Sequence, residues 1–260
     1  MILRRLSQSL KTQNWTAIWI EFILLVSGVF LGIQVSNWNV ERETKQKAAV
    51  FTQRLKADLR EEAFGYQYLI EYNRDVLASA ENAVNALTAK VPLSNEQLLI
   101  NAYRATQYKQ PQRFRASYDE LISTGNIGLI KDQKLRLTAM RVYNVATMDN
   151  MVREGSQSRY REAFRMSIDN DVQRALNKQC GDRYVERGDY QAIMNVIDYP
   201  CSLDLPQNEI DEAAYALRSN PLFVSYLRVR IADIGTRLTD MTGNNKDLLQ
   251  GLRAVAEEKP

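Results

Sequence analysis

Residues 15–38 read WTAIWIEFILLVSGVFLGIQVSNW, and this stretch decides how the rest of the chain is interpreted. Between Phe22 and Val35 the only polar residues are Ser27 and Gln34. As a helix the stretch would be roughly 34 Å long, which matches a hydrocarbon core of about 30 Å. The tryptophans of the chain all lie at its two ends, where amphipathic rings favour the headgroup region: they are Trp15, Trp19 and Trp38. The pattern predicts a transmembrane helix with interfacial anchors rather than a buried helix of a soluble protein.

The flanking residues favour an uncleaved signal anchor over a cleaved signal peptide. Residues 1–14 carry basic side chains and no acid, but no small-x-small cleavage site follows the apolar run. We therefore expect residues 1–14 to be a short cytoplasmic stub and residues 15–38 to be a transmembrane signal anchor. Residues 39–260 would form a helical extramembrane domain. Basic residues after the anchor outnumber those of the stub, so charge alone does not fix the orientation.

The two cysteines bear on the compartment. Cys180 and Cys201 bound a segment with Gly181, Gly188 and Pro200 near its ends. This arrangement is compatible with a disulfide in an oxidising compartment, and the alternative is two unrelated buried thiols in a cytosolic domain. Together with the basic stub, the disulfide alternative predicts a single-pass protein of the bacterial inner membrane. Its N-terminus would be cytoplasmic and its C-terminal domain periplasmic.

Small residues line one side of the predicted anchor. Gly28 and Gly32 form a GxxxG pattern, Ser36 extends it, and Glu21 falls on nearly the same face. Small residues let a second helix approach closely, and a carboxyl group near the membrane edge can hydrogen-bond across such a contact. We expect this face to contact a transmembrane helix of a second copy or of other membrane protein subunits. The alternative is that glycine is common in membrane spans and that Glu21 reaches the interface.

The remainder of the sequence predicts helices. Apolar residues recur every three or four positions with no proline before Pro92, so one long helix should continue out of the anchor: Ala48, Phe51, Leu55, Leu59, Ala63, Tyr66, Leu69, Val76, Ala80, Val84 and Leu87. Further helices are expected over residues 95–107, 116–124, 132–178, 207–219 and 220–241, with Ser94 as the N-cap of the first of these and an interruption at Gly243 after the last. Residues 180–201 are the least helical part. The fold class is all-α: a single N-terminal transmembrane helix continuing into an extended antiparallel helical bundle.

Composition excludes several chemistries. The chain of 260 residues has no histidine and two cysteines, which removes histidine-dependent nucleophile systems, histidine-ligated metals and four-cysteine metal sites. Its net charge of +3 and scattered basic residues predict no nucleic-acid partner. No phosphate-binding loop or nucleophile motif occurs, so we expect no catalytic site, no cofactor and no metal. We interpret Asp169-Asn-Asp171 as a solvated helix face, and Arg113-Phe-Arg115 and Arg228-Val-Arg230 as parts of ion-paired amphipathic helices. The alternative for the two arginine motifs is contact with anionic lipid or an acidic partner.

Two segments, GVFLGIQVSNWN at residues 28–39 and SYDELISTGNIGLIKD at residues 117–132, resemble a known family. In this family of uncharacterised bacterial single-span inner-membrane proteins, the apolar anchor closes on a Gln-x-x-Asn-Trp-Asn pattern. A Glu-Leu-x-Ser-Thr-Gly segment then precedes a helix, and Gly128 stands where that pattern has a polar residue. The resemblance implies an inner-membrane protein with a helical body, and it implies no activity.

The second segment has a structural interpretation as a helix corner. Gly125 would end one helix in a left-handed conformation, and Asp132 would cap the next. The apolar residues would anchor the corner in the core: Leu121, Ile122, Ile127, Leu129 and Ile130. The alternative is a ligand or partner contact through Tyr118, Asp119 and Asn126. The predicted helix-corner motif comprises Tyr118, Leu121, Gly125, Asn126 and Asp132.

Three functions remain compatible with these features. The first is a non-catalytic membrane-anchored interaction protein, an accessory or scaffold subunit of a bacterial envelope complex. The second is a periplasmic ligand-sensing helical bundle that signals through a partner. The third is an enzyme that uses clustered carboxylates. An exposed apolar groove would support the first function, a pocket with convergent Arg, Tyr and Asn side chains the second, and paired buried carboxylates the third.

Overall fold

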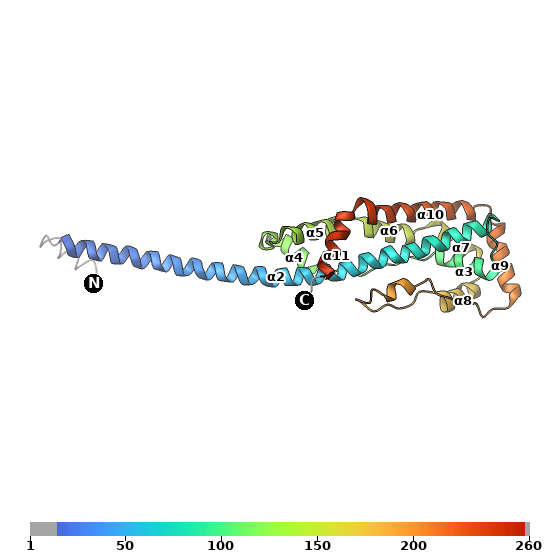
Figure 1. The fold of residues 1–260 in the computed structure, drawn as a ribbon, viewed down its shortest axis with the longest axis horizontal. Helices are drawn as coiled ribbons and strands as arrows, with labels where there is room; N and C mark the ends of the chain where they lie inside the picture. The colour runs from blue at the N-terminus through green and yellow to red at the C-terminus, as the bar shows by residue number, and fades with distance from the viewer. Residues whose placement is uncertain (1–14, 258–260) are drawn as a thin grey trace. The chain divides into compact units, whose positions relative to one another are not determined.

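A computed structural model describes residues 15–257, and within this range the chain contains helices and no strands. This confirms the all-α fold class. Figure 1 shows α2 as a single continuous helix at the start of the described chain. The α-helices are α2 (Trp15–Leu87), α3 (Asn95–Ala105), α4 (Ala116–Ser123), α5 (Gln133–Asn144), α6 (Thr147–Ser156), α7 (Arg159–Ser167), α8 (Asn170–Cys180), α9 (Gln207–Ser219), α10 (Phe223–Thr239) and α11 (Lys246–Glu257). Short 3-10 turns cover Ile127–Leu129 and Ala192–Asn195, and a π-helical turn covers Asp240–Asn244.

The described chain divides into two compact units. The first contains residues 15–53 and Gly128–Lys131. The second, called the body below, consists of Arg54–Ile127 and the chain from Asp132 onward. The predicted stub at residues 1–14 lies outside the described residues. Helix α2 contributes to both units, as the unbroken apolar periodicity predicted.

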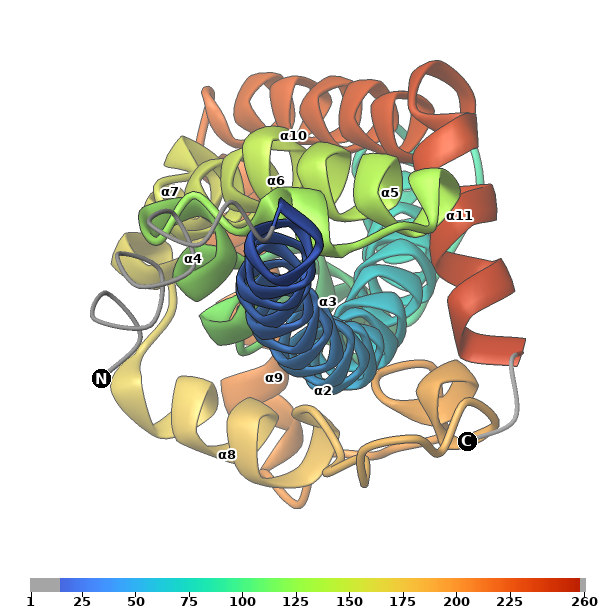
Figure 2. The ribbon, with the colours of Figure 1, turned by 90° about the vertical axis from the view of Figure 1, so that its left-hand side faces the viewer.

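In the body, the later part of α2 supplies a long buried stripe. Figure 2 shows α5, α10 and α11 on one side of this part of α2 and α8 and α9 on the other. Its buried positions recur every three or four residues because a helix repeats its faces at that interval. They include Leu55, Leu59, Tyr66, Leu69, Ile70, Tyr72, Val76, Ala80 and Ala83.

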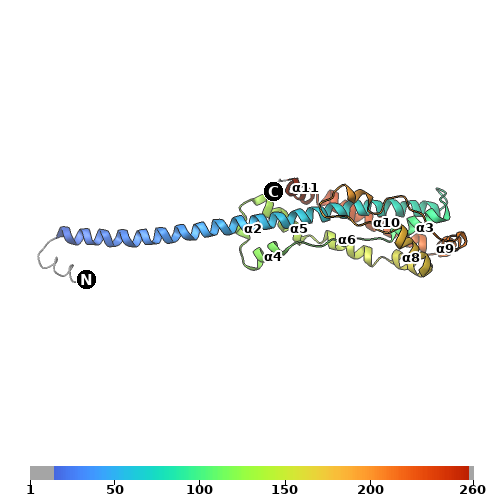
Figure 3. The ribbon, with the colours of Figure 1, turned by 90° about the horizontal axis from the view of Figure 1, so that it is seen from below.

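A large apolar cluster joins α3, α7, α8 and α9 to the end of α2 and the start of α10. Figure 3 shows α3, α8 and α9 at one end of the body and α4 and α5 at the other. Aromatic rings fill the centre of this cluster, and the rings of Tyr160 and Phe223 lie 5.0 Å apart between centroids. The Tyr160 hydroxyl donates to the carbonyl oxygen of Ala102, so its polar end is satisfied inside the core.

The predicted helix boundaries at Ser94, Gly125 and Asp132 are confirmed. Ser94 and Gln97 form a capping box at the start of α3, with the Gln97 N–H donating to Ser94 Oγ at 3.1 Å. Gly125 follows α4 with φ of +69°, a conformation that glycine adopts at little cost. Asp132 accepts from the backbone N–H groups of Lys134 and Leu135 at the start of α5.

The single long helix predicted over residues 132–178 is wrong. The structure has α5, α6, α7 and α8 in its place, although the range contains no proline. Val145 and Ile168 have extended backbone conformations that end α5 and α7. One helix over this range would be roughly 70 Å long, whereas the shorter helices each bury an apolar side in the body. The buried residues of this range include Val142, Met148, Met151, Tyr160, Phe164, Val172 and Leu176.

The last part of the chain differs slightly from expectation. The predicted helix start at Asn220 and Pro221 moves to Phe223, because the Asn220 side chain accepts the N–H of Leu222 in a turn that precedes α10. The predicted interruption around Gly243 is confirmed as the π-helical turn before α11.

Candidate functional site

The beginning of α2 exposes an apolar surface. Among the residues that the structure describes, α2 is the one helix that is long and apolar enough to cross a membrane, and none of its most apolar stretch is buried in the protein. Leu24, for example, is 66 % exposed. The predicted interfacial anchors are exposed as well: Trp15, Trp19 and Trp38. Because burial inside this protein does not account for these side chains, the stretch is a candidate contact surface.

The predicted helix-contact residues share α2 with this surface. A Cβ atom added at Gly28 or Gly32 would meet no described atom within 4 Å. Ser36 is exposed beside them, and Glu21 is partly exposed. The face is therefore open to a neighbour, and contact with a second helix stays a prediction.

The helix-corner motif packs within the protein. Tyr118 is 5 % exposed, its hydroxyl accepts from Asn144 Nδ2 at 3.0 Å, and its ring lies 4.7 Å from that of Tyr143. Asp119 forms an ion pair with Arg115. These contacts give Tyr118 and Asp119 structural roles at the predicted site.

The remaining residues of the corner divide into buried and exposed ones. Leu121 and Ile130 are fully buried, as predicted. The expectation that Ile122 is a core anchor is wrong, since it is 48 % exposed. Asn126 is exposed and donates to Thr124 Oγ1 within the turn.

A buried carboxylate holds the loop before α4 against α2. Glu62 accepts from Arg113 Nε at 3.0 Å and from the Phe114 N–H at 2.6 Å. Burial raises the pKa of Glu62, although both of these hydrogen bonds act to lower it. Arg113 also pairs with the exposed Asp149. The sequence does not mark Glu62 as a site residue, because one charged residue inside an apolar stripe does not reveal a partner 51 positions away.

The two Arg-x-Arg motifs differ in the structure. Arg113 and Arg115 pair with carboxylates, which confirms the ion pairing, but both lie in the loop before α4 and not in an amphipathic helix. The ion-pair interpretation is wrong for Arg230. This residue is 3 % exposed and donates to the carbonyl oxygens of Ala105 and Gln107 at the end of α3. Burial lowers the pKa of Arg230 to about 10. Carbonyl oxygens at a helix C-terminus carry partial negative charge, so they serve as its counter-charge.

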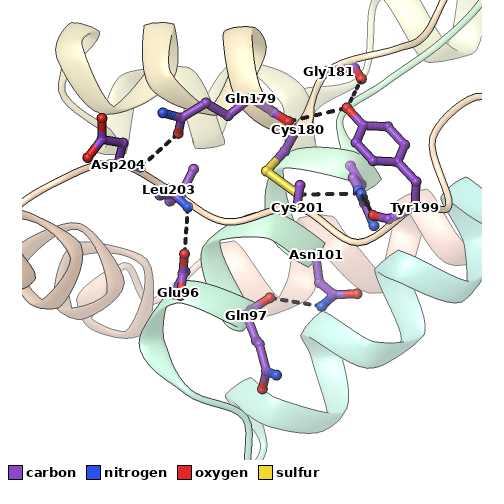
Figure 4. Close-up of a disulfide and its surroundings, with 11 residues drawn as sticks. Glu96, Gln97, Asn101, Gln179, Cys180, Gly181, Tyr199, Cys201, Leu203 and Asp204 are labelled. Carbon is purple, nitrogen blue, oxygen red and sulfur yellow. Dashed lines mark hydrogen bonds between the residues drawn. A yellow bond between two sulfur atoms is a disulfide. The ribbon is translucent and has the colours of Figure 1, made fainter.

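Cys180 and Cys201 form a disulfide, as predicted (Figure 4). It joins the end of α8 to the segment that precedes α9. The Tyr199 hydroxyl donates to the Gly181 carbonyl oxygen at 2.5 Å, and the Leu203 N–H donates to Glu96 of α3 at 2.6 Å. Asp169 and Asp171 are exposed at the start of α8, as expected of a solvated face.

Arg104, which contacts Cys201 of the disulfide, and Asp75 each have a buried polar atom with no described partner. Arg104 donates from Nη2 to the Tyr199 carbonyl oxygen at 2.6 Å, while its buried Nε has no partner among the described residues. Asp75 Oδ2 is likewise buried with no described partner. Burial, followed by the neighbouring carboxylates of Asp198 and Glu71, raises the pKa of Asp75 to about 6.

Two of the body's cavities bear on function. One, of about 430 Å³, lies between α2 and α11 and is mainly apolar. The other, of about 400 Å³, lies between α3, α7 and α8 and is lined by polar and basic side chains. The second combines Arg, Tyr and Asn side chains, including Tyr103, Arg161, Arg165, Arg174 and Asn177. Within residues 15–257, no group of three or more His, Cys, Asp or Glu side chains is placed to hold a metal ion.

The structure does not bring the predicted site residues together. The helix-corner motif begins in α4 at one end of the body, while Cys180 ends α8 at the other (Figure 3). The anchor residues all lie on the first part of α2. The basic cavity was not predicted from the sequence. The one local signal for it is the spacing of Arg161 and Arg165 by one helical turn.

These features define an all-α protein with an exposed apolar helical segment, a disulfide-linked body and a basic cavity. The chain belongs to a family of unknown function (DUF6090), which matches residues 21–157. The matched range contains the GxxxG pattern, the Asn-Trp-Asn segment and the helix corner. No curated protein and no solved structure matches the chain.

Proposed function

We propose that the protein is a non-catalytic membrane-anchored interaction protein, an accessory or scaffold subunit of a bacterial envelope complex. The observation that carries this proposal is the exposed apolar stretch of α2. In water a contiguous apolar surface costs about 25 cal/mol per Å², and large patches of this kind are typical of membrane or partner contacts.

The charge pattern of α2 supports a membrane boundary near Trp38. Directly after this residue, Glu41 pairs with Lys45 and Glu43 pairs with Lys47, and all four side chains are more than half exposed. Such i,i+4 pairs suit a helix surface in water. Apolar surface thus gives way to solvated charge at the tryptophan, as expected where a helix leaves a bilayer.

The disulfide supports placing the body in the periplasm. Disulfides persist in oxidising compartments and are rare in the cytosol. With the basic residues at the N-terminus, this favours a single pass through the inner membrane with the N-terminus in the cytoplasm. The open face at Gly28 and Gly32 supports association with another transmembrane helix.

The basic cavity favours a second candidate function, a periplasmic ligand-sensing bundle. Its convergent Arg, Tyr and Asn side chains are the combination that suits a small polar ligand. In this alternative the signal passes to a partner through α2.

Membrane anchoring is tested with paired charge substitutions in the full-length chain. Val26→Arg with Phe30→Arg should move the protein out of the membrane fraction, because each arginine costs about 3 kcal/mol at the centre of a span. The matched control is Val50→Arg, an exposed position on α2 beyond Trp38. Retention of the double variant in the membrane, or equal release of the control, contradicts the anchor.

The interaction role is tested by extraction from the native membrane in a gentle detergent. Native size analysis and mass spectrometry of the co-purifying proteins should show a stoichiometric larger complex. A monomer or homo-oligomer alone contradicts the accessory role and favours ligand sensing.

A further inference from the structure

The cavity between α3, α7 and α8 concentrates positive charge. Arg161 and Arg165 reach it from successive turns of α7, and Arg174 reaches it from α8. Among the described residues that line the cavity there is no aspartate or glutamate. Arg174 pairs with Asp171 on its own helix, whereas no carboxylate partner is described for Arg161 or Arg165.

This arrangement differs from that of other arginines in the body. Arg113 faces Glu62, and Arg237 faces Glu154 and Asp240. Burial lowers the pKa of Arg161, and the nearby charge of Arg165 lowers it further. A partly buried guanidinium with a second, exposed guanidinium close to it is stabilised when an anion lies between the two.

The contacts that hold the Arg161 side chain at the cavity do not use all of its N–H donors. Arg161 donates from Nη1 to the Thr106 carbonyl oxygen at 3.0 Å, and its guanidinium lies 4.9 Å from the centre of the Tyr108 ring. These contacts fix the side chain while Nε and Nη2 have no described acceptor. An arginine fixed in this way loses less entropy when it binds a ligand.

The opposite wall provides further donors. The Tyr103 hydroxyl donates to Asn177 Oδ1 at 3.1 Å, which leaves the Asn177 amide nitrogen with no acceptor among the described residues. Burial raises the pKa of Tyr103 to about 12, so the hydroxyl keeps its proton. The rings of Tyr103 and Phe164 form an apolar wall behind these groups.

We propose that the cavity between α3, α7 and α8 binds a small organic oxyanion, a carboxylate or phosphate, through Arg161 and Arg165. The planar guanidinium fork matches two oxygens of either group. Asn177 donates from the facing wall, and Arg174 lies at the cavity as a further positive charge. A volume of about 400 Å³ is that of a small-molecule site. The inference rests on the second candidate function, ligand sensing, for which it names the ligand class, and it does not depend on the interaction role.

The test uses the full-length protein in detergent, with calorimetric titration of citrate, succinate and inorganic phosphate at constant ionic strength. At least one probe should bind with a dissociation constant of about 1 mM or tighter. Binding of the carboxylates alone identifies a carboxylate site, and binding of phosphate identifies a phosphate site. If none of the three probes binds in this range, the proposal is overturned.

Variants show whether binding depends on the cavity. Arg165→Gln should weaken binding about tenfold or more, because a charge-assisted hydrogen-bonded pair is lost. Arg165→Lys, which keeps the charge without the fork, should weaken it less. Arg228→Gln is the matched control, since Arg228 is exposed on α10 and does not line the cavity. Equal losses in Arg165→Gln and Arg228→Gln would show diffuse charge attraction and overturn the proposal.

Folding of the variants is checked by their unfolding midpoints without probe. Arg165 is exposed and no side-chain contact is described for it, so its replacement should leave the midpoint unchanged. If Arg165→Gln is destabilised, the folded variants Arg165→Lys and Arg161→Lys are used in its place. Each of them keeps the positive charge but lacks the guanidinium fork. If both bind the probes as tightly as the unaltered protein, the fork contact is contradicted.

Discussion

Arg113 Nε lies 3.0 Å from Glu62 Oε2, and the glutamate side chain is only 1 % exposed. The Phe114 N–H donates to the other oxygen of the same carboxylate. One side chain of α2 therefore fixes two successive residues of the loop that leads into α4. The pair lies 51 positions apart in the chain, so it is a tertiary contact of the body.

Replacing Glu62 with alanine should destabilise the body by about 3 kcal/mol, because Arg113 and the Phe114 N–H lose their buried partner. Urea unfolding of the full-length protein in detergent measures this. Asp119→Ala is the control, since its pair with Arg115 is about half exposed and should contribute less than about 1 kcal/mol. Equal effects of the two substitutions would contradict a special role for Glu62.

Replacing Gly155 with alanine should also destabilise the protein. A Cβ atom at this position would lie 2.5 Å from Cβ of Tyr108, so the helix or the loop must shift. Overpacking of this kind costs about 1–3 kcal/mol. At Gly235 the same substitution meets no described atom within 4 Å, and alanine should stabilise α10 by about 0.5–1 kcal/mol. The two thermal midpoints should therefore move in opposite directions, and a fall at both positions argues against the clash.

Reduction of the disulfide should lower the stability of the body by about 3 kcal/mol, because the closed segment no longer restrains the unfolded chain. Alkylation of denatured protein, followed by intact mass measurement, should add two labels only after reduction. The double replacement Cys180→Ser and Cys201→Ser should match the reduced protein and no longer respond to reductant. Two free thiols in unreduced protein from the native envelope would exclude the bond.

The pKa of about 6 for Asp75 predicts a pH dependence of stability. An unfolded aspartate has a pKa of about 4, so the folded protein binds this proton more tightly. The resulting stabilisation is complete below about pH 4 and is lost as the pH rises to about 6. The thermal midpoint should therefore fall as the pH rises through this range, and Asp75→Asn should reduce that fall. The pKa of Asp211 is lowered by hydrogen bonds from Asn95 and Gln207, so Asp211→Asn should not reduce it.

The open face of α2 predicts self-association or subunit contact. Replacing Gly28 and Gly32 with isoleucine should reduce the size of the assembly in gentle detergent, because larger side chains keep a second helix at a distance. Val29→Ile, which changes an exposed apolar residue between them, is the control. An unchanged assembly in the double glycine variant shows that this face is not the contact.

The sequence by itself determined the all-α class, the continuous helix α2, the boundaries at Ser94, Gly125 and Asp132, and the cysteine-bounded segment. These features depend on local properties: apolar spacing, side chains that cap neighbouring N–H groups, and a glycine that tolerates positive φ.

Only the tertiary structure decided that residues 132–178 form four helices, that Arg230 meets carbonyl oxygens, and that Tyr103 and Asn177 face each other across 74 positions. Residues such as Val145 and Ile168 carry no strong breaking signal, and the chain turns there because each short helix buries its own apolar side. The basic cavity likewise requires α3, α7 and α8 to be packed together, since no local pattern specifies which distant side chains share a wall.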